Sequence, residues 1–125
     1  MNVIFTCGGT AGHINPAIAV AKMMQQRYPD AQVYCMLMLP RRGNTTQPTA
    51  FNAELTEVIE HFGYTAVDLE NCGITPEPEI FDVYITDKRV HPGPLGMDKM
   101  TQALIKAMMG KEDATFSVTQ DLVNV

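Results

Sequence analysis

Apolar residues recur along the chain in two patterns that alternate with one another. Three short segments are rich in apolar and β-branched residues, as buried strands of a parallel sheet are; they are residues 3–6, 32–39 and 64–70. Three longer segments carry apolar residues at helical spacing; they are residues 16–27, 50–61 and 97–109. Strand therefore alternates with helix, which predicts an α/β domain built on an open parallel sheet with right-handed crossovers.

Proline and glycine mark where these elements begin and end. Pro16 suits the first turn of the first helix, and Gly63 suits the end of the second. Residues 76–94 contain four prolines and are predicted to form an extended loop. Within that loop, residues 81–86 are either a short strand or a packed segment without regular structure.

The end of the chain leaves the number of strands open. Phe116 and Val118 alternate with polar residues as in a strand, so residues 111–125 either add an edge strand, pair with a second copy or fray. The sheet is accordingly predicted to have three or four strands. With 125 residues the chain is about one domain long, and we expect a single α/β domain over residues 1–110.

Charge and cysteine content exclude several classes of function. The net charge is -5 and the Lys and Arg residues are scattered, so no basic stripe is available for nucleic acid. No apolar stretch approaches the roughly 20 residues of a membrane span, and no signal peptide is visible, so we expect a cytoplasmic protein. Three cysteines without Cys-x-x-Cys spacing suggest reduced thiols, no metal and no cofactor.

The stretch "TCGGTAGHINPA", residues 6–17, is the first candidate site. A glycine turn between a strand and a helix leaves backbone N–H groups unpaired beside the positive end of the helix dipole, where phosphate binds well. The stretch lacks the residues of a Walker loop and of a dinucleotide fingerprint. The simpler alternative is that the glycines only satisfy the geometry of the turn.

Residues 8–22, "GGTAGHINPAIAVAK", make the chain from about residue 1 to 25 resemble the start of the MurG glycosyltransferases, which add N-acetylglucosamine to lipid I. The resemblance implies a pocket for the diphosphate of the acceptor, with His13 as a catalytic candidate. Its lining would be Gly8, Gly9, Thr10, Gly12, His13 and Asn15. That family needs a second domain to hold the sugar donor, for which this chain has no residues, so we expect no complete glycosyltransferase.

Three later stretches resemble the last part of an SGNH (GDSL-like) hydrolase over about residues 23–110. They are "RYPDAQVYCMLMLPRRG", "FNAELTEVIEHFGYTAVDLENCGI" and "DKRVHPGPLGMDKMTQALIKAM". The resemblance implies a flavodoxin-like fold in which His91 is the catalytic base and Asp87 orients it. The family spaces this pair as Asp-x-x-His, whereas here three residues intervene, and no Gly-Asp-Ser block is present.

The nucleophile of such a hydrolase has no obvious counterpart. The one serine, Ser117, lies in the tail. Cys7 is a substitute candidate because it follows a strand and precedes a helix, which can lower a thiol pKa, although such cysteines also serve as inert apolar residues. His91 itself has an alternative role as a cap of the following helix.

Together the resemblances suggest a chimera of two families with a seam near residues 20–30, folded as a flavodoxin-like or Rossmann-like half domain. We expect no catalytic activity from it. Two alternatives are a weak ester or acyl hydrolase that uses His91 and Asp87, and a module that binds phosphate or a diphosphate sugar at residues 8–15. A narrow sheet with open edges also predicts a homo-oligomer, formed in one version by strand swapping.

Overall fold

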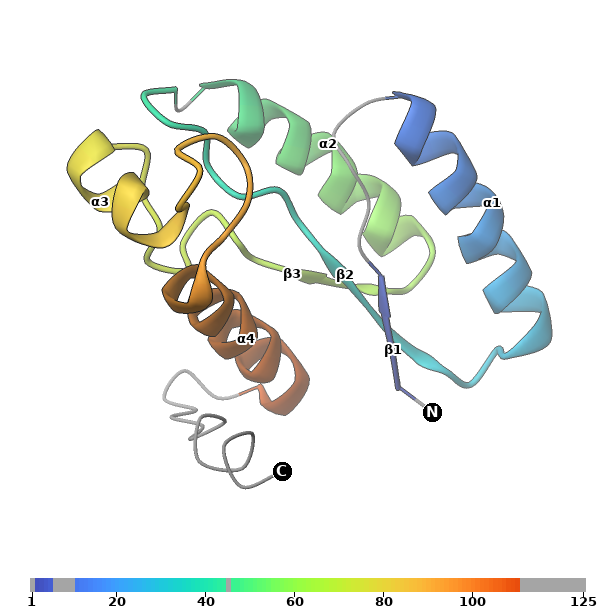
Figure 1. Ribbon diagram of the computed structural model, residues 1–125. Helices are drawn as coiled ribbons and strands as arrows, with labels where there is room; N and C mark the ends of the chain where they lie inside the picture. Colours follow the sequence, from blue (N-terminus) through green and yellow to red (C-terminus); the bar gives the residue numbers. More distant parts are fainter. Residues whose placement is uncertain (1, 6–10, 45, 111–125) are drawn as a thin grey trace.

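The computed structural model describes residues 2–5, 11–44 and 46–110 and shows a parallel three-stranded sheet with helices on both faces (Figure 1). The strands are β1 (Asn2–Phe5), β2 (Gln32–Met36) and β3 (Thr65–Val67), in the order β1-β2-β3. Val3 pairs with Val33, and Cys35 pairs with Ala66. The predicted α/β class is confirmed, while residues 111–125, for which an edge strand, pairing with a second copy and fraying were left open, lie outside the described residues.

The central strand is buried from both sides. Val33 is 3% exposed and its neighbour Tyr34 is 6% exposed, although adjacent residues of a strand point to opposite faces. Tyr34 packs with Val67, Leu69 and helix α4 (Pro94–Met109), whereas Cys35 lines a cavity between the two helices of the other face. This two-sided burial explains why the sequence of β2 is mostly apolar rather than alternating.

Helices α1 (Ala11–Arg27) and α2 (Thr46–His61) are the crossovers between consecutive strands and lie side by side on one face (Figure 1). Because the strands follow one another in sheet order, right-handed crossovers must put both helices on the same face. The opposite face is covered by α4 (Pro94–Met109), and the short helix α3 (Pro78–Tyr84) packs beside it.

All three predicted helices begin earlier than the sequence predicts, and α4 begins at Pro94 instead of Met97. Helix α1 begins at Ala11, so Pro16 lies inside it and the prediction that Pro16 occupies the first turn is wrong. Helix α2 begins at Thr46 because Asn44 supplies the starting contacts: its Oδ1 accepts hydrogen bonds from the backbone N–H and the hydroxyl of Thr46, both at 3.1 Å. Gly63 adopts a φ of 71° just after α2, as expected at a helix end.

Residues 81–86 are not a strand, and most of them belong to helix α3. Pro78 occupies the first turn, where its missing N–H costs nothing. Phe81 and Ile85, four residues apart, are each 1% exposed, whereas Val83 between them is 51% exposed. This spacing buries one side of a helix, while a strand would bury Phe81, Val83 and Ile85 together.

Candidate functional site

The loop between α3 and α4 holds both residues of the predicted catalytic pair. Its two ends lie side by side. Ile85 and Pro92 form an isolated antiparallel β-bridge, and the backbone N–H of Gly93 donates a hydrogen bond to the Tyr84 carbonyl at 2.8 Å. Gly93 lies so close to Thr86 that an added Cβ would come within 2.4 Å of the threonine Cγ2. These contacts hold the two ends of the loop together.

Asp87 organises the interior of this loop. Its Oδ1 accepts hydrogen bonds from the backbone N–H groups of Arg89, Val90 and His91 at 2.8, 3.0 and 3.1 Å. Its Oδ2 lies 2.5 Å from Nδ1 of His91. The two predicted residues are thus brought together even though three residues separate them. Lys88 makes this possible, because its φ of 58° turns the chain back over the carboxylate.

The environment of Asp87 favours its charged form. Partial desolvation on its own would raise the pKa of this carboxyl group, but the opposing hydrogen bonds outweigh it. These come from the backbone N–H of Arg89, the His91 ring, and the backbone N–H groups of His91 and Val90. The pKa of Asp87 consequently lies well below its ordinary value.

His91 is oriented by Asp87 and open to solvent. Its side chain is 81% exposed, so Nε2 is accessible to a ligand while Nδ1 is held by the carboxylate. An imidazole held in this way can accept a proton from a nearby hydroxyl, thiol or water. This contact is the one that the predicted roles of base for His91 and orienting acid for Asp87 require, and the roles themselves stay predictions.

The remaining predicted site residues fall outside the described part of the chain or at its margin. Cys7, Gly8, Gly9 and Thr10 lie outside the described residues, as does Ser117. Gly12, His13 and Asn15 lie in the first part of α1, but their side chains are not among those described. The described elements nearest to these residues are β1, which ends at Phe5, and α1, which begins at Ala11.

A cavity of about 350 Å³ lies beside the Asp87–His91 loop, at the carboxyl end of β2. Arg89, Val90 and Pro92 of the loop line it, together with the segment that follows β2. No motif in the sequence indicates this cavity. The available signal was the position of Arg41, which follows a buried strand at the sheet edge where ligands of parallel sheets bind.

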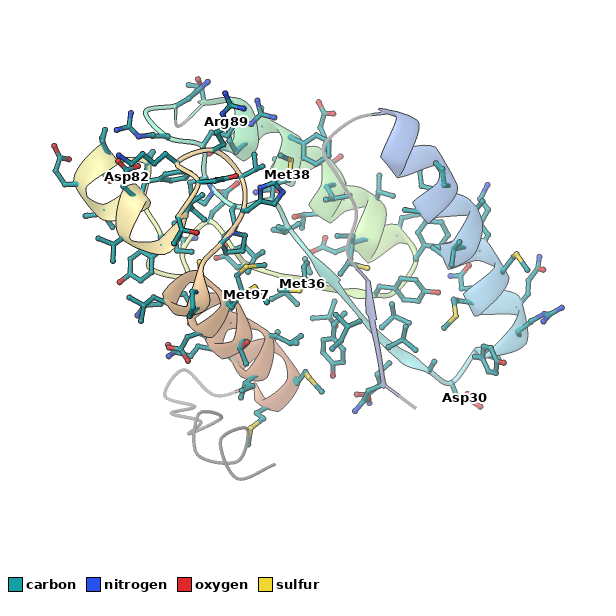
Figure 2. All side chains as sticks on the ribbon, in the orientation of Figure 1. Asp30, Met36, Met38, Asp82, Arg89 and Met97 are labelled. Carbon is teal, nitrogen blue, oxygen red and sulfur yellow. The ribbon has the colours of Figure 1, made fainter. Side chains whose placement is uncertain are left out.

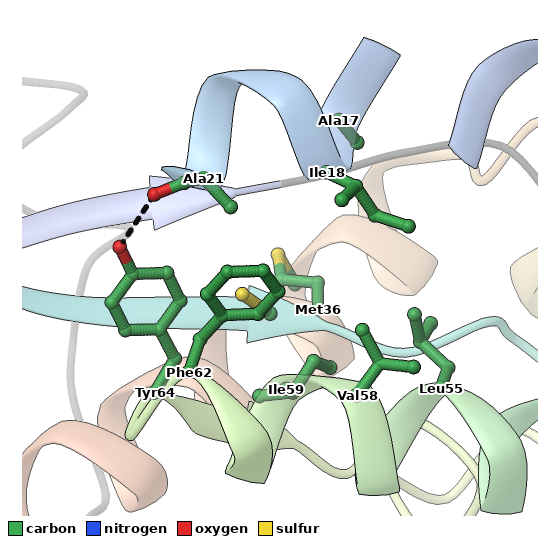
Figure 3. Close-up of a pocket in the computed structure, with 10 residues that line it drawn as sticks. Ala17, Ile18, Ala21, Met36, Leu55, Val58, Ile59, Phe62 and Tyr64 are labelled. Atoms are coloured by element: carbon green, nitrogen blue, oxygen red, sulfur yellow. Dashed lines mark hydrogen bonds between the residues drawn. The ribbon is translucent and has the colours of Figure 1, made fainter. Parts of the chain in front are cut away.

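A second cavity lies between α1 and α2 and has a volume of about 50 Å³ (Figure 3). Its walls are apolar, and at one end the Tyr64 hydroxyl donates to the Ala21 carbonyl at 3.0 Å. Ligand sites usually have volumes of about 300–1,000 Å³. The space between α1 and α2 is therefore a packing void and not a candidate site.

The described residues contain no group of three His, Cys, Asp or Glu side chains positioned to share a metal ion. Cys72 is a partly buried thiol whose Sγ lies 3.3 Å from the Leu69 carbonyl, and burial raises its pKa. It is accordingly a poor nucleophile. Within the same part of the chain, no helix is long and apolar enough to cross a membrane.

Comparison with known proteins supports one of the two resemblances. No family model matches the chain. Short local matches link it to UDP-N-acetylglucosamine--N-acetylmuramyl-(pentapeptide) pyrophosphoryl-undecaprenol N-acetylglucosamine transferases, the MurG enzymes. The match is 54% identical over 33 residues for the protein of Acetivibrio thermocellus and 47% over 36 residues for that of Thermobifida fusca.

These matches cover 26% and 29% of this chain, but only 9% and 10% of the two transferases. A third, from Christiangramia forsetii, is 52% identical over 33 residues and covers 26% of this chain and 9% of that protein. The chain thus spans about a tenth of the length of the curated relatives it matches. Nothing in the comparisons supports the resemblance to SGNH hydrolases. What is shown is an α/β domain that contains a MurG-like segment.

Proposed function

We propose that this chain is a non-catalytic α/β domain that binds phosphate or a diphosphate sugar at the turn between β1 and α1. The observation that carries the proposal is the local identity of 47–58% to transferases whose name describes a pyrophosphoryl substrate. Because the chain spans about a tenth of those proteins, binding of one ligand group is supported and the complete transfer reaction is not.

The described elements are suited to this role. Helix α1 is 17 residues long and begins just after the glycine segment, so its positive end faces the carboxyl end of the sheet. Ligands of open parallel sheets bind at that edge. The first N–H groups of a helix have no intrahelical partners and can donate to phosphate oxygens.

The test is a titration of the ¹⁵N-labelled chain with inorganic pyrophosphate, followed by amide chemical shifts. We expect saturable shifts at the start of α1 and weaker binding by about tenfold in the Gly9→Val variant, whose side chain would obstruct the backbone donors. The exposed His61, at the end of α2, provides the matched variant His61→Gln, which should bind as the original chain does. Absence of saturable shifts in the original chain would refute the proposal.

A second candidate function is ester hydrolysis, and the observation that favours it is the hydrogen bond between Asp87 and the exposed His91. In this mechanism Nε2 of His91 takes a proton from water or from the Cys7 thiol as that group attacks the ester carbonyl. Hydrolysis of p-nitrophenyl acetate by the His91→Gln and Cys7→Ala variants tests it. Any exposed histidine hydrolyses this ester slowly, so His61→Gln is the required control; equal rates for the two histidine variants would exclude the mechanism.

A further inference from the structure

The 350 Å³ cavity at the carboxyl end of β2 combines apolar walls with a positively charged rim. Its apolar side chains come from four different segments of the chain and include Leu39, Leu69, Phe81, Ile85 and Met100. The volume lies within the range of about 300–1,000 Å³ that is usual for small-molecule sites. Figure 2 shows Met36, the last residue of β2, and Met38 beyond it, together with Arg89 on the loop between α3 and α4.

Two guanidinium groups belong to this cavity. Arg41 follows β2 and Arg89 follows Asp87, and both residues line the cavity while remaining exposed. No ion pair joins either of them to a carboxylate within the part of the chain that the structure describes. Among the described residues that line the cavity, two are cationic and none is acidic.

The nearby carboxylates are already engaged. Asp82 receives two hydrogen bonds from the Arg42 guanidinium, at 2.8 and 3.0 Å, and lies 4.0 Å from Lys88 Nζ. Asp87 is held by three backbone N–H groups and His91. Neither acid lines the cavity, whose only charged lining residues in the described part of the chain are Arg41 and Arg89.

The concentration of cations here contrasts with the rest of the chain. The net charge of the chain is -5, yet both charged residues of the cavity lining, Arg41 and Arg89, are cationic, while the adjacent Arg42 and Lys88 already face Asp82. Charge complementarity therefore points to an anionic ligand, and the apolar walls point to a ligand with an aliphatic body. Arginine suits a carboxylate best, because its planar fork can donate two parallel hydrogen bonds.

We propose that this cavity binds an aliphatic carboxylate of medium chain length. The carboxylate lies between Arg41 and Arg89, and the aliphatic chain lies against the partly exposed Leu37, Leu39 and Met100. This site differs from the phosphate site proposed at the β1–α1 turn in its position and in its ligand. Its occupation requires neither the glycine segment nor proton transfer by His91.

The experiment is a set of amide-shift titrations of the full chain with octanoate, butanoate and octan-1-ol. Octanoate should shift the amides of residues 37–41 and 85–92 in a saturable manner. Each buried methylene strengthens binding roughly fourfold, so butanoate should bind at least tenfold more weakly. Octan-1-ol retains the aliphatic chain but lacks the charge, and it should also bind at least tenfold more weakly.

Substitutions distinguish the contribution of the two arginines to binding from the contribution of the apolar walls. Arg41→Gln and Arg89→Gln should each weaken octanoate binding about tenfold and leave octan-1-ol binding unchanged. The matched control is Arg27→Gln, since Arg27 is exposed at the end of α1, far from the cavity lining. Equal affinity for octanoate and octan-1-ol, or unchanged octanoate affinity in both cavity variants, would overturn the proposal, as would shifts confined to other residues. Binding of pyrophosphate at the β1–α1 turn is measured in a separate titration. Absence of binding at one site therefore does not affect the test of the other site.

Discussion

Asn52 is a buried residue that joins α2 to the segment following β2. It is 2% exposed, and its Oδ1 accepts the Met38 N–H at 2.8 Å while its Nδ2 donates to the Met38 carbonyl at 3.0 Å. The same Nδ2 also donates to Oε1 of Glu70 at 2.9 Å. The asparagine therefore satisfies the backbone of a segment that has left the sheet and links it to the loop after β3.

Asn52→Ala should lower the free energy of unfolding by about 2 kcal/mol, because it leaves both backbone groups of Met38 without their partner. Urea denaturation at neutral pH measures this change. Asn71→Ala is the control, since the exposed Asn71 only donates to Asp68, and it should change the free energy by less than about 0.5 kcal/mol. Equal effects of the two substitutions would show that Asn52 is not a structural bridge.

Lys88 is the described non-glycine residue with a positive φ, at 58°. A side chain in this conformation costs about 1–2 kcal/mol, and glycine avoids that cost while losing some entropy on folding. Lys88→Gly should therefore stabilise the chain by about 1 kcal/mol in urea denaturation. Lys88→Ala removes the same charge but keeps Cβ, so it should give no such gain; a gain in both variants would point to the charge instead.

At the residue scale, candidate catalytic residues were easier to identify from the sequence than residues that form structural hydrogen bonds. Asp87 and His91 were identified as a pair by resemblance, and the structure places them in contact, although their catalytic roles remain predictions. The spacing alone could not establish the contact, because it depends on the left-handed conformation of Lys88. The sequence did not indicate that Asn52 is a buried structural residue, because an asparagine in a helix can equally well lie at an exposed position.

Helix α4 packs against the end of α3 through Gly96. A Cβ at this position would lie 2.4 Å from the Tyr84 carbonyl oxygen and 2.9 Å from the Pro92 Cβ. Gly96→Ala should therefore destabilise the chain by about 2 kcal/mol, even though alanine is favoured over glycine in a helix by about 1 kcal/mol. Thermal and urea unfolding would measure the change.

The control for Gly96→Ala is Met97→Ala, on the same turn of α4. Met97 is 51% exposed, so its truncation should alter the unfolding free energy by less than about 0.5 kcal/mol. A stabilised Gly96→Ala variant would mean that α4 moves away from Tyr84 without cost and that this close approach does not fix the loop.

At the element scale, the apolar pattern located the three long helices and all three described strands, but it overestimated the length of β2 and β3 and missed helix α3. The strand predicted at residues 64–70 contains only β3, Thr65–Val67, because the chain then turns around Asp68, whose Oδ1 accepts the Glu70 N–H at 2.9 Å. Helix α3 was missed because alternation of Phe81, Val83 and Ile85 resembles a strand. The spacing of four between Phe81 and Ile85, together with Pro78, was the signal for a helix.

At the scale of the whole molecule, alternation of strand and helix was sufficient to predict the parallel sheet and its class. The cavity beside β2 could not be predicted, because its lining is drawn from segments on both sides of α2, β3 and α3. Such a site depends on tertiary packing and has no local sequence pattern. Self-association and the proposed seam between two families remain predictions.

The acid stability of the whole chain should depend on Asp87 and Asp82. Hydrogen bonding from Arg42 lowers the pKa of Asp82, and the loop hydrogen bonds lower that of Asp87 despite partial desolvation. A carboxylate with a lowered pKa in the folded state stabilises that state fully above its unfolded pKa of about 3.9. This contribution is lost as the pH falls through the folded-state pKa, because the unfolded chain then binds more protons.

Asp87→Asn isolates the charge of this residue, because the amide oxygen can still accept the three backbone hydrogen bonds. In urea denaturation the variant should be less stable than the original chain at neutral pH, and the difference should narrow steadily as the pH falls below about 4. Asp30→Asn provides the matched control at an exposed position beyond α1, and its difference should stay close to zero throughout. A difference for Asp87→Asn that did not change with pH would show that the neutral hydrogen bonds, and not the charge, hold the loop closed.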